Sequence, residues 1–143
     1  MTYTPPTWPV SVKGVALDAR GRVLLLKNER EEWELPGGQL EAADSSPEHT
    51  VERELQEESG WTVKAGLLLD VWIYQPLPQT LPDRRVVIIT YGCLVLTPQA
   101  VSVISHEHRE IGLFTAVEVL GLAMPEGYRR SIASWNQRSH EIT

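Results

Sequence analysis

One helix with clear start and stop signals constrains the fold of this chain more than any other feature. Ser46 followed by Pro47 is typical of a helix N-terminus, where serine caps the first turn and proline occupies the first helical position. Gly60 supplies a matching C-terminal stop. The sequence therefore predicts a helix over residues 47–59, with strand patterns on both sides of it.

These strand patterns are rich in valine, isoleucine and leucine, and they account for most of the remaining chain. The predicted strands lie at residues 9–18, 23–28, 31–38, 61–75, 84–96 and 110–119, the last of which leads into a turn of helix. The first two form a predicted hairpin around Asp18–Arg22, and Gly37 and Gly38 end the third. We expect a bend at Gly66, a buried central strand in the apolar run 84–96, and a C-terminal helix over residues 124–137.

The length and composition favour one α/β domain over residues 1–143. The net charge of −6, with no basic stripe to offset it, argues against nucleic acid as a partner. Cys93 is the only cysteine and lies in an apolar run, which predicts a buried thiol and excludes an intramolecular disulfide. No segment approaches the roughly 20 apolar residues of a spanning helix, and the N-terminal region lacks a secretion signal. We therefore expect a cytoplasmic protein with no membrane partner.

The predicted helix carries Glu54, Glu57 and Glu58 at positions i, i+3 and i+4, on one face. A solvated acidic face with Arg53 as a local ion-pair partner is the simpler interpretation. Two features favour a bound cation instead: no lysine separates the glutamates, and they lie in the second half of the helix, where its dipole disfavours negative charge. Hard divalent ions such as Mg²⁺ bind carboxylate and carbonyl oxygens, and the glycines before the helix can present a bare carbonyl to the same ion.

The stretch RELQEESGW, residues 53–61, resembles the second half of the Nudix box, the signature of the MutT-like Nudix hydrolase family. It fits the pattern R-E-U-x-E-E-x-G-U, in which U is bulky and apolar, at every fixed position. The first half departs from the family pattern. Counting five residues on from Gly38 reaches Asp44, not a glutamate, and eight residues instead of seven then precede Arg53. The loop carries one extra residue, and its acidic position is either Asp44 or lost at Ser45.

The resemblance implies a Nudix-type α/β/α sandwich around a mixed β-sheet, and hydrolysis of a nucleoside diphosphate linked to another moiety. It also implies a divalent cofactor, Mg²⁺, with Mn²⁺ as the alternative ion. The implied metal ligands are three glutamates of the helix and a glycine carbonyl: Glu54, Glu57, Glu58 and Gly38, with Gly37 as the alternative carbonyl.

The implied catalytic residues are Glu54, Glu57, Arg53 and Glu107. In this scheme Glu54 is a further ligand or a base, and Arg53 orients the glutamates by ion pairing. The family often uses one more glutamate from a distal loop as ligand or general base. Glu107 is our first choice for that role, and Glu110 is the second.

Three more residues are candidates for substrate binding. Trp33 could stack on a nucleobase or pack on the sheet, and packing is favoured. Arg84 and Arg85 could hold a phosphate as charge-assisted donors, or simply lie on the surface at the start of a strand.

The leading functional hypothesis is an Mg²⁺-dependent pyrophosphohydrolase acting on a small-molecule nucleotide. Its substrate stays open among nucleoside triphosphates, nucleotide sugars, ADP-ribose and dinucleoside polyphosphates. A catalytically silent nucleotide-sensing or interaction module is the alternative from another class, although such modules usually lose the box glutamates that this chain keeps. An isomerase of the isopentenyl-diphosphate type is a third, disfavoured because Cys93 lies within a strand. The resemblance leaves a homodimer open, and the sequence fixes no dimer surface.

Overall fold

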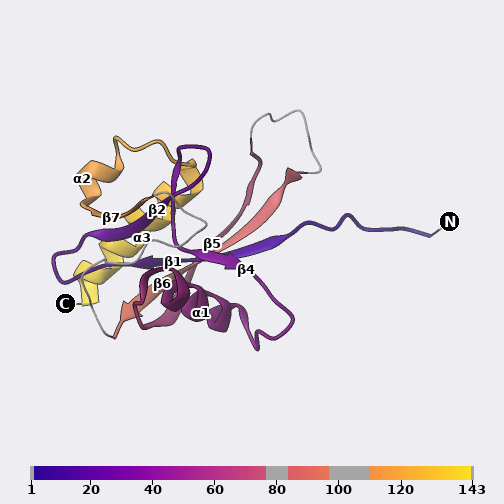
Figure 1. Cartoon of the computed structure of the whole chain (residues 1–143), viewed down its shortest axis with the longest axis horizontal. Coiled ribbons are helices and arrows are strands. Elements are labelled where there is room, and N and C mark those ends of the chain that lie inside the picture. The colour runs from indigo at the N-terminus through magenta and orange to yellow at the C-terminus, as the bar shows by residue number, and fades with distance from the viewer. Residues whose placement is uncertain (1, 77–83, 97–109, 143) are drawn as a thin grey trace.

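The computed structural model describes residues 2–76, 84–96 and 110–142 (Figure 1). Its elements follow in the order β1 (Val10–Ala16), β2 (Val23–Lys27), β3 (Trp33–Glu34), β4 (Gly37–Gln39), α1 (Pro47–Ser59), β5 (Val63–Tyr74), β6 (Val86–Val95), β7 (Glu110–Phe114), α2 (Ala116–Val119) and α3 (Glu126–Ile142). Within these ranges, no helix is both long and apolar enough to cross a membrane.

The strands form two sheets, and the larger sheet is mixed. Its order is β4-β1-β6-β5, in which β1 runs parallel to β6 and the other neighbours are antiparallel. The second sheet has the order β3-β2-β7 and is antiparallel. A mixed sheet with packed helices confirms the predicted α/β fold class. The apolar run 84–96 is confirmed as a central strand, because β6 has a neighbour on each edge.

The two long helices pack against different hydrophobic clusters. Helix α1 contributes Val51 and Leu55 to one cluster, and α3 contributes Tyr128 and Ile132 to the other. Figure 1 shows α1 and α3 on opposite sides of β1 and β6. Trp135 of α3 also packs against the second cluster.

The bounds of α1 agree with the predicted start and stop signals. The Ser46 side chain accepts a hydrogen bond from the His49 N–H at 3.1 Å, and Pro47 occupies the first turn. At the other end, Gly60 has a positive φ of 78° and its N–H donates to the Gln56 carbonyl at 2.9 Å. These contacts satisfy backbone groups that a helix end otherwise leaves exposed. Local sequence therefore determines where the glutamate-bearing helix begins and ends.

The predicted hairpin between the first two strands is wrong. β1 already pairs with β4 on one edge and β6 on the other, so β2 has no edge available and joins the second sheet. The two strands are linked by one isolated bridge, Leu17 to Val23, and by contacts between Asp18 and Arg22 in the turn, without a ladder. The turn around Asp18 is present, with the Gly21 N–H donating to the Asp18 carbonyl at 3.0 Å, but it carries the chain from one sheet to the other.

Two further strand predictions have different outcomes. Gly37 and Gly38 were expected to end a strand, yet they form β4 and pair with Lys13 and Val12 of β1, so that expectation is wrong. Glycine is needed there because Gly37 has a φ of 144°, and a Cβ would come within 2.0 Å of the Val12 carbonyl oxygen. The bend expected at Gly66 is confirmed by shifts of the β5–β6 register between Ala65 and Asp70.

The buried thiol of Cys93 gives a first testable prediction. The residue is 3% exposed, and burial, with a smaller contribution from Glu52, raises the pKa of the thiol to about 12. Because the thiolate is the reactive species, we expect alkylation of the folded protein at pH 8 to be roughly 10²–10³ times slower than in denaturant. Iodoacetamide labelling followed by intact mass gives an unambiguous readout, since the chain has a single cysteine. Equal labelling rates in both states would contradict this burial.

Candidate active site

Helix α1 lies close to β1 because of a glycine between them. A Cβ on Gly14 would come within 2.8 Å of the Val51 side chain, so a larger residue would push the helix outward. Val51 and Leu55 are fully buried against the sheet. The helix face next to this apolar stripe is thereby held against β4, the short glycine strand that precedes the helix.

Glu58 makes the innermost contact between α1 and that strand. Its side chain is buried, with the residue only 3% exposed, and its Oε1 accepts a hydrogen bond from the Gly37 N–H at 2.8 Å. A buried carboxylate is tolerated only where donors or cations compensate for its lost hydration. The Gly37 amide is such a donor, and it fixes the end of α1 to β4.

Glu54 lies one turn earlier on the same helix and faces Gly38. A Cβ on Gly38 would be 2.5 Å from the Glu54 carboxyl carbon and 2.6 Å from its Oε1. Only glycine leaves room for the carboxylate against the backbone of β4. The structure thus brings together Glu54, Glu58 and the Gly37–Gly38 backbone, while their role as metal ligands stays a prediction.

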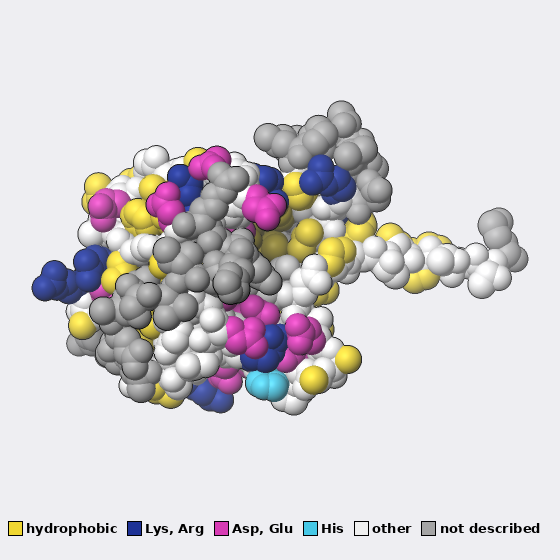
Figure 2. All heavy atoms as spheres, viewed as in Figure 1, with side chains coloured by type: hydrophobic (Ala, Val, Ile, Leu, Met, Phe, Trp, Pro, Cys, Tyr) yellow, Lys and Arg dark blue, Asp and Glu magenta, His cyan; other side chains and the backbone are white. Residues whose placement is uncertain are grey.

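Arg53 joins the remaining glutamate to this group. Its Nη1 donates to Glu54 Oε1 at 3.0 Å and lies 3.4 Å from both carboxylate oxygens of Glu57. The Glu57 side chain is 57% exposed, so it is the most accessible of the three glutamates. Figure 2 shows acidic side chains gathered around a basic one over α1. The predicted ion-pairing position of Arg53 agrees with these contacts.

Asp44 occupies the acidic position that the sequence left undecided. Its carboxylate forms a two-point ion pair with Arg53, at 3.0 Å from Nε to Oδ1 and 3.0 Å from Nη2 to Oδ2. It also accepts hydrogen bonds from the Thr50 hydroxyl at 2.8 Å and the Glu41 N–H at 2.9 Å. The loop with the extra residue is therefore tied to α1 through Asp44, and Arg53 is held from the side opposite to the glutamates.

These contacts predict how stability depends on pH. The Arg53 hydrogen bonds, with the Glu41 and Thr50 donors, hold the pKa of the Asp44 carboxyl well below its usual range. Because the pKa of the Asp44 carboxyl is lower in the folded protein than in the unfolded one, its ion pair stabilises the fold above the unfolded pKa of about 3.9. This stabilisation is lost as the pH falls below that value. We expect Asp44→Asn to lower the melting temperature at pH 7, and the difference from the wild type to shrink below about pH 4.

Thermal melts of both proteins at pH 7, 5 and 3 would measure this effect. Asp18→Asn is a second test of the same principle, because Asp18 forms a comparable ion pair with Arg22 in the β1–β2 turn and, despite burial, hydrogen bonds from Arg22 and Arg20 lower its pKa. A loss of stability in Asp44→Asn that is the same at pH 3 and pH 7 would show that charge is not the cause.

The donor chemistry of this group suits a hard divalent cation. Carboxylate oxygens and a bare glycine backbone are the ligands that Mg²⁺ and Mn²⁺ prefer. Among the described residues, no three histidine, cysteine, aspartate or glutamate side chains gather tightly enough to enclose a metal by themselves. Mg²⁺ is commonly bound through one or two carboxylates together with waters and substrate phosphates, so Glu54 and Glu58 beside the Gly37–Gly38 backbone suit such an ion.

The other predicted site residues have different surroundings. Glu107 lies outside the described residues, so its role stays a prediction. Glu110, the second choice, lies at the start of β7, and its carboxylate is 3.7 Å from the Lys27 ammonium. Trp33 packs against Phe114 with ring centroids 4.7 Å apart, in line with the favoured packing role.

The two arginines at the start of β6 also differ from each other. Arg84 is exposed, which leaves its predicted phosphate contact open. The Arg85 guanidinium lies over the Trp8 ring, 5.5 Å from its centroid, and the residue is half-buried. A role for Arg85 in substrate binding therefore competes with a role in holding the N-terminal segment against β6.

Sequence reasoning missed a buried polar cluster beside the glutamates. Lys13 of β1 lies 3.8 Å from Glu34 Oε1, and the Asn28 amide donates to Glu34 Oε2 at 3.2 Å. The sequence does contain a sign of this cluster, because Lys13 is the one charged residue in the strand VSVKGVA. A lysine inside an apolar strand that pairs on both edges is seldom left without an acidic partner.

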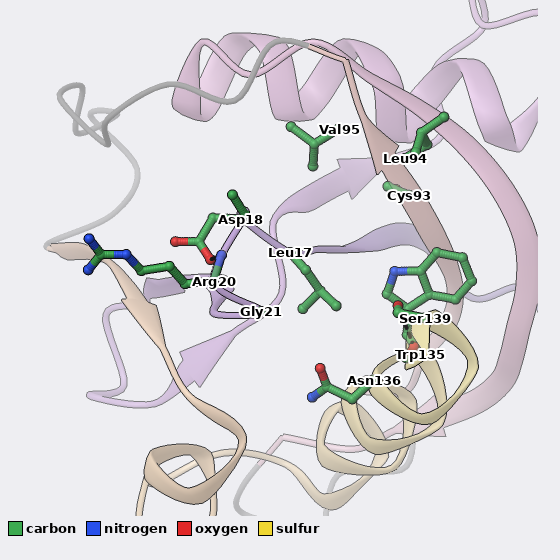
Figure 3. A pocket seen from close by; sticks show the side chains of 11 residues that line it. Leu17, Asp18, Arg20, Gly21, Cys93, Leu94, Val95, Trp135, Asn136 and Ser139 are labelled. Carbon is green, nitrogen blue, oxygen red and sulfur yellow. Dashed lines mark hydrogen bonds between the residues drawn. The ribbon is translucent and has the colours of Figure 1, made fainter. Parts of the chain in front are cut away.

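A pocket of about 530 Å³ lies elsewhere in the molecule (Figure 3). Its walls come from the β1–β2 turn, the end of β6 and α3, with Leu17, Cys93 and Trp135 among its apolar lining and Asn136 among its polar lining. Neither the α1 glutamates nor the Gly37–Gly38 strand contributes to it. This pocket is therefore separate from the glutamate site.

Comparison with known proteins identifies one family. The NUDIX domain matches residues 7–135 of the chain. A MutT-like protein from Streptomyces ambofaciens is 43% identical over 70 residues, which cover 48% of this chain and 45% of that protein. The match thus spans less than half the length of this curated relative.

Solved structures show the same fold at low sequence identity. A MutT protein from Methanosarcina mazei Go1 has a TM-score of 0.74 and 24% identity, covering 97% of this chain and 99% of that one. An ADP-ribose pyrophosphatase from Streptococcus suis has a TM-score of 0.67 and 21% identity, covering 93% and 92% of the two chains. At such identities, the likeness concerns the arrangement of the elements.

Proposed function

This chain belongs to the NUDIX domain family, and we propose that it is a metal-dependent hydrolase that cleaves the diphosphate linkage of a nucleoside diphosphate derivative. The observation that carries the proposal is the contact between α1 and β4. There, Glu54 and Glu58 of RELQEESGW meet the bare Gly37–Gly38 backbone. The proposed active unit is one domain over residues 1–143, acting on a small-molecule nucleotide.

Mg²⁺ is the proposed ion, with Mn²⁺ as a substitute, and Glu54, Glu57, Glu58 and the Gly38 carbonyl would hold it. When bound, such an ion neutralises phosphate charge and lowers the pKa of a bound water. The chain's own residues set the geometry. Glu58 is fixed by the Gly37 N–H, while Arg53, anchored by Asp44, orients Glu54 and Glu57.

A carboxylate of this group is also the proposed general base. A positioned carboxylate can accept a proton from an attacking water. Glu54 is well placed because its carboxylate lies against Gly38 and is steered by Arg53. Glu107 is the proposed alternative, from outside the described residues. Trp33, Arg84 and Arg85 stay the candidates for contacts with the nucleotide.

The substrate class can be tested directly. Release of phosphate or nucleotide would be followed by mass spectrometry with Mg²⁺ and a panel of nucleoside triphosphates, nucleotide sugars, ADP-ribose and dinucleoside polyphosphates. ADP-ribose belongs in the panel because one structural neighbour bears the name of an ADP-ribose pyrophosphatase. Cleavage that disappears with EDTA supports the hydrolase and names its substrate class.

A catalytically silent nucleotide-binding module is the competing function. Retention of Glu54, Glu57 and Glu58 argues against it, since a module without chemistry has no need for a crowded acidic face. Silence across the panel, in a protein that binds Mn²⁺ and nucleotides, would support the module instead. Size-exclusion chromatography with light scattering on the same sample would decide whether the active species is a monomer or a homodimer.

A further inference from the structure

The glutamate site has a buried positive charge behind it. Lys13 is only 7% exposed, although lysine is almost never buried unless it is paired. Its ammonium lies 3.8 Å from Glu34 Oε1, and both side chains are largely shielded from water. The proposed chemistry makes no use of this lysine, so its position needs a separate explanation.

The backbone register places Lys13 directly behind the glycine strand. Lys13 pairs with Gly37 in the β1–β4 ladder, and a Cβ on Gly37 would come within 2.9 Å of the Lys13 Cδ. The lysine stem therefore packs against the glycine backbone. The amide of the same glycine donates to Glu58 at 2.8 Å, and Gly38, the next residue, touches Glu54. Gly37 alone thus separates the lysine stem from Glu58, and Gly38 follows it toward Glu54.

Lys13 has an acidic partner, since its ammonium lies 3.8 Å from Glu34 Oε1. Burial lowers the pKa of that ammonium, but the neighbouring Tyr128, Glu34, Glu58 and Glu54 leave the pKa raised. Tyr128 is neutral near pH 7, because burial raises its own pKa to about 12, so the attraction at that pH comes from the three carboxylates. The two glutamates of α1 that would hold a metal are therefore also within electrostatic reach of a fixed cation. Because this cation is buried, water and salt screen it far less than a surface lysine.

We propose that Lys13 sets the affinity of the glutamate site for divalent cations, acting as a fixed positive charge behind the Gly37–Gly38 strand. Its charge offsets part of the negative charge of Glu54 and Glu58 that would otherwise attract an ion. Lys13 thereby weakens metal binding while it keeps two crowded carboxylates stable in the absence of metal. The inference rests on the proposed function only in taking these glutamates as the metal site.

If Lys13 acts in this way, a mutation near the metal site should raise the affinity for the ion instead of lowering it. Lys13→Gln removes the charge and keeps a donor for Glu34, so we expect it to bind Mn²⁺ more tightly, by roughly 3- to 30-fold. Lys13→Arg keeps the charge and should stay near the wild-type affinity. Glu34→Gln removes a nearby negative charge and should weaken binding. Damage to the fold would lower the Mn²⁺ affinity of every variant. A higher affinity for Lys13→Gln together with a lower affinity for Glu34→Gln would therefore point to charge and not to damage.

The measurement is a titration with Mn²⁺ alone, followed by electron paramagnetic resonance and calorimetry, with melting curves to verify folding. Lys64→Gln is the matched control, because Lys64 pairs with Glu52 of the same helix but its side chain is 70% exposed, and it should leave the affinity unchanged. If Lys13→Gln does not fold, Lys13→Met, which keeps the apolar stem, replaces it in the comparison.

Equal or weaker Mn²⁺ binding by a folded, uncharged Lys13 variant would overturn the inference. Because the probe is the ion alone, the result does not depend on knowing the substrate. Tighter binding by Lys13→Gln in a protein that turns over no substrate would support the inference while counting against the proposed hydrolase. A wild-type protein that binds no Mn²⁺ would overturn both.

Discussion

Replacing Glu57 with glutamine is expected to lower the rate of hydrolysis by about 10²–10³ or more, the usual effect of removing one electrostatic catalytic group. The side chain is 57% exposed and contacts Arg53, so an amide of the same shape should leave the fold intact. What it removes is the charge that would hold the ion. The rate would be measured on the substrate identified by the panel, together with Mn²⁺ affinity and melting temperature.

Glu52→Gln is the matched control for this experiment. It removes the same charge from the same helix, but Glu52 faces β5, where its Oε2 accepts the Ala65 N–H at 2.9 Å, and an amide oxygen can still accept that bond. We expect its rate to stay within a few-fold of the wild type. Activity of Glu57→Gln close to that of Glu52→Gln would remove Glu57 from the site and shift the chemistry to Glu54 and Glu58.

Substituting alanine for Gly38 should have the second-largest effect, a loss of rate of about 10²-fold, as expected when a catalytic group is displaced by about 1 Å. The added Cβ would lie 2.5 Å from the Glu54 carboxyl carbon. That carboxylate is the far end of a flexible side chain, so it can turn away and the protein should still fold. Mn²⁺ affinity should fall with the rate, because both depend on Glu54.

Two other glycine variants show whether this reasoning is correct. Gly66→Ala places its Cβ 3.4 Å from the Gly92 carbonyl oxygen, an ordinary contact in β5, and should keep near wild-type activity. Gly37→Ala meets backbone atoms instead of a flexible side chain, and its φ of 144° disfavours alanine, so it should lower the melting temperature sharply. A Gly38→Ala protein as unstable as Gly37→Ala would mean that the strand, and not Glu54, gives way.

Local signals predicted the glutamate helix well because they depend on neighbours in sequence. Ser46, Pro47 and Gly60 specify the ends of α1 through contacts within a few residues. The 3.6-residue period of the helix then places Glu54 and Glu58 toward one side and Val51 and Leu55 toward the core. Such local features can be predicted without knowing the rest of the fold.

Strand pairing was less predictable, since it depends on which edges are free. The pattern at residues 9–28 is typical of a hairpin, but β1 is occupied on both edges by β4 and β6. The glycine pair looked like a strand end because glycine has a low strand propensity, whereas its packing against Val12 and Lys13 requires glycine within a strand. Both errors arise from contacts between residues distant in sequence.

The sequence by itself determined the family, the class of fold and the glutamates that carry the proposed chemistry, because the box is a contiguous motif on one capped helix. Only the tertiary structure decided that Asp44 holds Arg53 despite the extra loop residue. It also decided that Glu58 is fixed by the Gly37 amide, and that Lys13 lies buried behind that strand. These contacts join β1, β4 and α1, and burial gives them their strength, since charges withdrawn from water act on one another far more strongly than on the surface.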